Sequence, residues 1–185
     1  FRTHQVSECY DNNTATQAAL TGIGQYLPNG VVMTPLFRLD DYSFHSAMAS
    51  ALCLGWPADD AKFDTARAQL LCERYRQVRH LFNKDWYALT PYNLDPSAWS
   101  GVQFNAPEDQ EGAILVFRRE QCPQPELCVS LRGLERTSSY ELTWQSTGRT
   151  ETVQGASLCD GYVIQLPEQR SSALILYRKV AADAR

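Results

Sequence analysis

The chain has 185 residues, of which 44% are hydrophobic and 21% charged, a balance that favours a globular protein of one domain or two small ones. Its formal net charge is −4 and it has no basic stripe, which argues against a nucleic-acid partner. No apolar run reaches the roughly 18 residues of a membrane span, so no membrane partner is expected.

The first segment, Phe1–Val6, mixes apolar, β-branched and polar residues and is predicted to be a short strand. It ends at Ser7 and Glu8, so a carboxylate follows the carboxyl end of a strand. Arg2 and His4 alternate along this strand and are therefore expected on one face.

Helical patterns dominate up to about residue 85, and a short apolar strand, GVVMTPLF, separates the first helix from the second. The predicted helices span residues 14–27, 43–56 and 59–83. Thr14 and Gln17 have capping-box spacing in the first helix, and Asp59 or Asp60 is expected to cap the third. The order strand, helix, strand, helix, helix is typical of parallel α/β units.

The second half changes to short β-rich runs that are separated by Gly, Pro, Ser and Asp. These runs span residues 112–119, 126–134, 139–146, 150–156, 161–167 and 172–180. Their spacing is typical of an antiparallel sandwich or barrel. The predicted organisation is an α/β part over 1–85, an interdomain linker over 86–110 and an antiparallel β domain over 111–185.

The six cysteines include no CxxC pair. Cys53 and Cys72 are expected as buried free thiols on helix faces, whereas Cys122 and Cys128 flank PQPE and are either bridged or free. This usage favours a reduced, cytoplasmic compartment. Because the chain begins without Met, an upstream signal stays open.

Two βα units cannot close an eight-stranded barrel or cover both faces of a parallel sheet. The chain is therefore interpreted as the C-terminal end of a longer protein, with the last strands of a (β/α)8 barrel followed by an antiparallel β-sandwich. Residues 1–85 should then expose apolar faces, so self-association is expected. A chain starting near Asp85 is expected to behave better.

Five segments occur in an order and spacing that resemble one known family. They are HQVSE (4–8), GQYLPNGVV (24–32), YSFHSAMASALCLGW (42–56), DWYALTPYNLD (85–95) and WSGVQFNAPEDQEGAILVFRRE (99–120). Together they resemble the C-terminal stretch of family 36 glycoside hydrolases, the α-galactosidase-like retaining enzymes whose clan includes family 27. The resemblance extends from about residue 2 to about residue 178.

The resemblance implies a (β/α)8 catalytic barrel, a C-terminal antiparallel β domain and two catalytic aspartates. The acid/base of the family lies in an SD pair that matches Ser7-Glu8, while the nucleophile strand would lie upstream. Glu8 is the predicted catalytic residue, although it is one methylene longer than the family's aspartate. Asp11 is a rival for the role, and a solvated loop glutamate is the alternative interpretation of Glu8.

Arg2, His4 and Asp41 are the predicted substrate-binding residues. Arg2 is as well explained by a structural salt bridge, and His4 by packing at a rim. Asp40 and Asp41 follow a strand and precede a predicted helix, and a helix cap is the favoured interpretation there.

The leading hypothesis is a fragment of an α-galactosidase-like retaining glycoside hydrolase whose partner is a carbohydrate substrate, an α-galactoside or a related glycoside. The three histidines show no metal-ligand spacing, so neither a metal nor a cofactor is expected. The alternative is a non-catalytic carbohydrate-binding or structural module with a degenerate barrel remnant.

Overall fold

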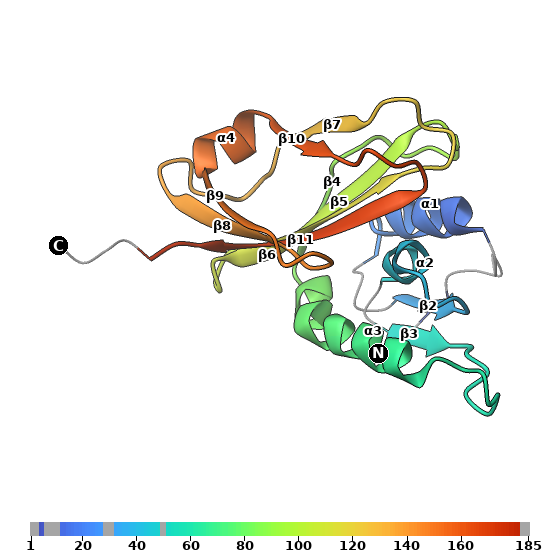
Figure 1. The fold of residues 1–185 in the computed structure, drawn as a ribbon. Helices are drawn as coiled ribbons and strands as arrows, with labels where there is room; N and C mark the ends of the chain where they lie inside the picture. Colours follow the sequence, from blue (N-terminus) through green and yellow to red (C-terminus); the bar gives the residue numbers. More distant parts are fainter. Residues whose placement is uncertain (1–3, 6–11, 28–31, 49–50, 182–185) are drawn as a thin grey trace.

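The computed structural model describes residues 4–5, 12–27, 32–48 and 51–181, in which helices and strands pack on both faces of a central antiparallel sheet (Figure 1). The N-terminal layer contains β1 (His4–Gln5), α1 (Asn13–Ile23), β2 (Val32–Leu36), α2 (Asp41–Ser46), β3 (Ala51–Leu54), α3 (Thr65–Val78) and the 3-10 helix η2 (Arg79–Asn83). Its three strands are parallel and lie in the order β1-β2-β3. The prediction of parallel α/β units is thus confirmed for this layer.

The second predicted helix, over 43–56, is wrong in its second half. Helix α2 ends at Ser46, and Ala51–Leu54 forms β3, which pairs with β2 in the register Thr34↔Leu52. A short apolar run fits a helix or a buried strand equally well, and here the free edge of β2 decides for a strand. Cys53 therefore lies exposed on β3 and not on a helix.

The other two helices have different caps from those predicted. Asn12 caps α1, because its side-chain oxygen accepts a hydrogen bond from the amide of Ala15 at 3.0 Å. Asp64 caps α3 by accepting from the amide of Arg67 at 2.9 Å. Asp60 instead accepts from the amide of Lys62, a local turn that keeps the chain out of a helix until Thr65.

The central sheet has six antiparallel strands in the order β4-β5-β6-β11-β8-β9. They are β4 (Asp85–Ala88), β5 (Trp99–Ala106), β6 (Glu111–Arg118), β8 (Ser139–Trp144), β9 (Thr150–Gln154) and β11 (Ser171–Lys179). A second, two-stranded antiparallel sheet joins β7 (Glu126–Val129) to β10 (Tyr162–Gln165), and helix α4 spans Gly155–Asp160. Each of the six predicted β-rich runs overlaps one of these strands.

Both faces of the central sheet are buried around β6, which explains why this strand is almost entirely apolar. Leu115 and Phe117 of β6 face the N-terminal layer, whereas Ile114 and Val116 face a second core beneath β7, β10 and α4. Alternate residues of a strand point to opposite faces, so one strand serves two cores. Phe82 of η2 packs on this sheet with its ring centroid 5.0 Å from that of Phe104, on β5.

The prediction of a linker over 86–110 is corrected by strands β4 and β5. Val102 and Phe104 of β5 are buried in the core that the N-terminal layer shares with the sheet. Strand β5 pairs with β6 along its whole length, from Trp99↔Arg118 to Ala106↔Glu111. Pro and aromatic residues around this segment suggested a linker, but the pairing of β5 with β6 is a long-range contact that the local pattern does not reveal.

Cys122 and Cys128 are both free, the first buried and the second exposed. Across the described part of the chain, no helix has the length and apolar character needed to cross a membrane.

Candidate functional site

The candidate site is a cleft of about 400 Å³ at the carboxyl edge of the parallel strands. In βα units each strand ends where the next helix begins, so the amino ends of α1 and α2 meet at this edge. The lining residues come from the start of α1, the segment after β2, helix α2, and the loops that follow β6 and precede β11. They are Asn12, Asn13, Thr14, Arg38, Tyr42, Glu120 and Arg170.

Arg170 lines this cleft and contacts two residues of the N-terminal layer. Its guanidinium lies 4.9 Å from the ring centroid of Tyr42, and its Nη1 lies 3.5 Å from Oδ1 of Asp40. Its backbone φ is 49°, a left-handed conformation that is unfavourable for a residue with a Cβ. Such strain persists where surrounding contacts impose it, and here they hold a cation at the mouth of the cleft.

Asp40 and Asp41 have different structural roles. Asp40 caps α2 by accepting from the amide of Ser43 at 3.0 Å, which confirms the favoured interpretation. Burial raises the pKa of its carboxyl, but the hydrogen bonds from Ser43 and the nearby arginines outweigh this and hold the pKa below its usual range. Oδ1 of Asp41 accepts from Arg67 at 2.7 Å and from Arg74 at 2.8 Å, and so ties α2 to α3.

Three predicted site residues, Arg2, Glu8 and the rival Asp11, lie outside the described residues. Of His4 the structure describes the backbone, which pairs with Val32 in the parallel sheet. The roles given to these residues in catalysis and substrate binding stay predictions, as does that of Asp41 in substrate binding.

A buried arginine next to the cleft was missed in the sequence. Arg119 is 1% exposed, and it follows β6 immediately. Its guanidinium donates to Oε1 of Gln17 at 3.1 Å and to Oδ1 of Asn93 at 2.8 Å, so it joins α1 to the segment between β4 and β5. The only sequence signal was the doublet Arg118-Arg119 at the end of an apolar strand, which resembles an ordinary solvated strand end.

His45 is a second buried polar residue, with its Nδ1 2.8 Å from the hydroxyl of Ser172 on β11. Burial is the main cause that lowers the pKa of its imidazole to about 4. His45 is therefore neutral near pH 7 and joins α2 to the central sheet by a neutral hydrogen bond.

The chemistry available in the cleft is that of hydrogen bonding and charge. Arg170 offers donors, Glu120 offers acceptors, and Asn13 offers both. Among the described residues, no three His, Cys, Asp or Glu side chains gather where they could hold a metal ion. The expected independence from metals and cofactors stays a prediction.

No protein-family model and no curated sequence matches the chain. Solved structures do match its fold. The α-galactosidase from Lactobacillus brevis superimposes with a TM-score of 0.73 at 14% identity, over 97% of this chain and 26% of that one. The family 36 α-galactosidase AgaB from Geobacillus stearothermophilus gives 0.72 at 18% identity, over 94% and 25% of the two chains.

The galactosidase domain of the α-galactosidase-sucrose kinase AgaSK gives a TM-score of 0.70 at 16% identity, over 94% of this chain and 25% of that one. The chain thus spans about a quarter of the length of these structures. At such low identity the likeness shows a shared fold.

Proposed function

We propose that the chain is the part of an α-galactosidase-like retaining glycoside hydrolase that completes the catalytic barrel and carries the C-terminal β domain. The observation that carries the proposal is the fold match, which includes the parallel layer and the antiparallel sheet together and covers 94–97% of the chain. In this proposal a preceding segment of polypeptide supplies the other barrel strands and the nucleophile.

Glu8 is the proposed acid/base. It follows Gln5, the last residue of β1, by three positions in the sequence. The carboxyl ends of barrel strands carry the catalytic groups of this architecture. A retaining enzyme needs two carboxyl groups roughly 5–5.5 Å apart. Glu8 would protonate the leaving oxygen while the upstream carboxylate attacks, and it would then deprotonate the water that releases the sugar.

Arg2, His4 and Asp41 are proposed to contact sugar hydroxyls. Both arginine contacts of Asp41 involve Oδ1, and the side chain is 37% exposed. Its Oδ2 makes no hydrogen bond to a described residue and is therefore open to a hydroxyl group. The two arginines would fix the orientation of this carboxylate before the substrate arrives.

The proposed substrate class is an oligosaccharide with a terminal α-galactosyl group. The Geobacillus stearothermophilus α-galactosidase AgaA, which matches 95% of this chain at 18% identity and a TM-score of 0.70, was solved in complex with stachyose. The polar lining of the cleft is compatible with a ligand rich in hydroxyl groups.

The first test is the activity of the 185-residue chain itself. Since the proposal takes the nucleophile from a preceding segment, the purified chain should not hydrolyse aryl α-galactosides. Reproducible turnover by the chain alone, absent from a mock preparation, would contradict the proposed division of the site.

The second test replaces Glu8 with Ala in a longer polypeptide that includes the preceding segment. General acid–base catalysis contributes roughly 10²–10⁴-fold, so natural α-galactosides should be hydrolysed slower by that factor. Activated aryl α-galactosides need little protonation, and added azide should restore their turnover by attacking the glycosyl-enzyme. Asp11→Ala is the matched control. Azide rescue confined to Asp11→Ala would transfer the role to Asp11.

A further inference from the structure

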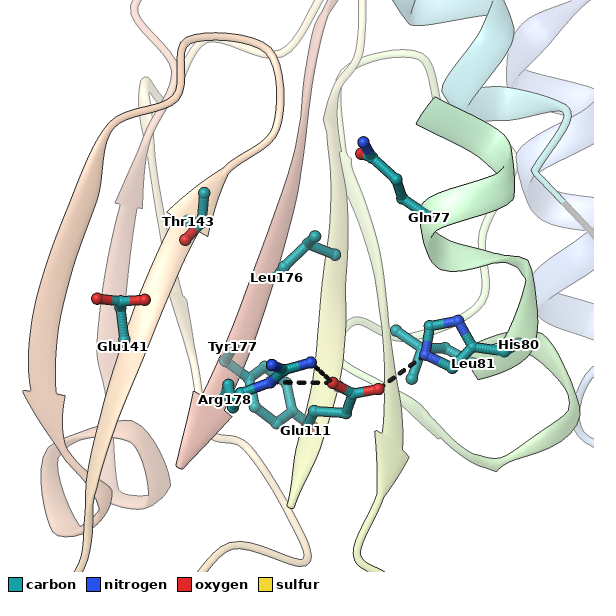
Figure 2. A pocket seen from close by; sticks show the side chains of 10 residues that line it. Gln77, His80, Leu81, Glu111, Glu141, Thr143, Leu176, Tyr177 and Arg178 are labelled. Carbon is teal, nitrogen blue, oxygen red and sulfur yellow. Dashed lines mark hydrogen bonds and ion pairs between the residues drawn. The ribbon is translucent and has the colours of Figure 1, made fainter. Parts of the chain in front are cut away.

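A second cleft, of about 260 Å³, lies between the α3–η2 segment and the central sheet (Figure 2). Gln77 of α3 and Leu81 of η2 form one wall, and Glu141 and Thr143 of β8 form the other. Leu176 of β11 lies on the floor between them. This cleft is distinct from the candidate site, because strand β6 has Glu111 at this end and Arg118 at the other. At about 3.3 Å per residue the two ends are roughly 23 Å apart.

The cleft exists because the N-terminal layer covers only part of the central sheet. Tyr140 and Leu142 of β8 are buried in the core on the far face of the sheet. On the near face, Glu141 is exposed and Thr143 is half-buried, since no helix extends over them. The polar side chains of β8 thus line a concave surface and not a flat one.

One end of the cleft is fixed by an ion-pair cluster. Glu111 of β6 accepts from Nε of Arg178 at 3.1 Å, and its other oxygen lies 2.7 Å from Nε2 of His80 (Figure 2). The guanidinium of Arg178 offsets the charge of Glu111, so these two groups together carry little net charge. These contacts shape this end of the cleft.

The hydrogen-bonding groups along the rest of the cleft are open. The side chains of Glu141 and Thr143 make no hydrogen bond to any described residue. The amide oxygen of Gln77 accepts from Nε2 of Gln145 at 3.3 Å, and the amide nitrogen of Gln77 donates to no residue that the structure describes. The open groups therefore comprise a carboxylate acceptor, a hydroxyl that can donate or accept, and an amide donor. Leu81 and Leu176 supply an aliphatic surface below them.

We propose that this cleft binds one neutral polyhydroxylated ring, a single sugar unit of a carbohydrate. Its volume lies just below the roughly 300–1,000 Å³ of typical small-molecule sites, which suits a ligand of one ring. Hydroxyl groups on opposite sides of the ring donate to Glu141 and accept from Gln77, and the C–H face of the ring rests on Leu176. Arg178 also lies opposite Glu141 in the register of β11 and β8, so one guanidinium offsets two carboxylates and the cleft disfavours an anionic ligand.

This site is independent of the proposed hydrolase chemistry, since it uses none of the residues assigned to catalysis. Its test is saturation-transfer difference NMR on the 185-residue chain with methyl α-galactoside and methyl α-glucoside. Glycerol serves as an open-chain polyol control and spermidine as a cation. Saturation of aliphatic side chains should pass most strongly to the ring C–H protons of the sugars.

Glu141→Gln should weaken sugar binding about tenfold or more, because a hydrogen bond to a charged acceptor is lost. Thr143→Val, which removes a hydroxyl at nearly constant shape, should also weaken it. The matched control is Glu168→Gln, an exposed acidic residue in the loop before β11. It should leave the affinity unchanged.

Absence of transfer up to the solubility limit of both sugars would overturn the proposal. So would an affinity for glycerol or spermidine equal to that for the sugars, or unchanged sugar binding in both Glu141→Gln and Thr143→Val. Binding that survives those two changes and is lost in Glu8→Ala would assign it to the proposed catalytic site instead, which separates the two proposals.

Discussion

The parallel layer and the central antiparallel sheet differ in how completely the described chain covers them. Every residue of β5 is buried, and so is every residue of β6 except Glu111. In the parallel layer, β2 is the only strand with a described neighbour on each side, while β1 and β3 each have one. Parallel sheets are normally covered on both faces, so the N-terminal layer is the less self-sufficient of the two.

The outer surface of α1 shows the same contrast. An apolar cleft of about 560 Å³ lies along this helix, with Tyr26, Leu27 and Tyr92 among its lining residues. Tyr26 is 84% exposed and Leu27 43%. The N-terminal layer thus leaves an apolar surface exposed along α1, whereas the residues that fill the two cores on the faces of the central sheet all come from the described chain.

The largest effect is expected from removing the parallel layer. A chain starting at Asp85 would uncover Phe104, Leu115 and Phe117, which pack against Phe44 and Phe82. The sequence suggested that such a chain would behave better, but the shared core argues the opposite. We expect it to bind the dye ANS and to lose cooperative unfolding, as measured by calorimetry. A soluble monomer with a sharp unfolding transition would show that the sheet is stable by itself.

A single substitution in the core shared by the two layers tests, with a smaller change, whether the layers unfold together. Phe44 is fully buried between the two layers, so Phe44→Ala should lower the free energy of unfolding by about 3–5 kcal/mol. Fluorescence and circular dichroism should report one coincident transition in urea, because both layers depend on this core. Val163→Ala, at a 48% exposed position on β10, is the control and should have a small effect. Separate transitions for the two layers would contradict the shared core.

His45, which joins α2 to the central sheet, should make the free energy of unfolding depend on pH. Burial lowers the pKa of its imidazole to about 4 from an ordinary value of 6.5, although Asp41 and Asp40 favour its charged form. Below pH 6.5 the unfolded chain binds the proton first, so stability should fall as the pH decreases from about 6.5 to 4. The loss is roughly 3 kcal/mol at most. Urea unfolding across this range should show the decline in the native chain and a flatter profile in His45→Gln. If the free energy of unfolding declined equally with pH in the native chain and in His45→Gln, His45 would not be the cause.

The smallest effects concern two helix caps. Asp64→Ala should lower the free energy of unfolding by about 1 kcal/mol, since it removes the cap of α3. Asp40→Ala should have a somewhat larger effect, because Asp40 also pairs with Arg170 across the two layers. The lowered pKa of Asp40 means that its contribution is present at neutral pH and is lost as the pH falls below its usual 3.8. If Asp64→Ala lowered the free energy of unfolding more than Asp40→Ala, the contact between Asp40 and Arg170 would contribute nothing.

Local patterns in the sequence were enough to find most of the strands. Runs such as SYELTWQS alternate apolar and polar residues, and β8 indeed buries Tyr140, Leu142 and Trp144 on one face. Asp40 as a cap was also predictable, since a short acidic side chain before a helix satisfies a free amide. The candidate cleft was only partly predictable: its edge of the parallel sheet was expected, but the contributions of Glu120 and Arg170 were not.

The sequence alone predicted most of the extended and helical segments and most of the turns, because these depend on neighbours within a few residues. Three features follow from tertiary contacts: Ala51–Leu54 is a strand, β5 joins the sheet and Arg119 is buried. Each depends on a partner that is distant in the chain or on a packing environment that no local window contains. Thr34 pairs with Leu52 on another strand of the same layer. Arg119 reaches Gln17 across 102 positions, a contact that exists only once the two layers have met.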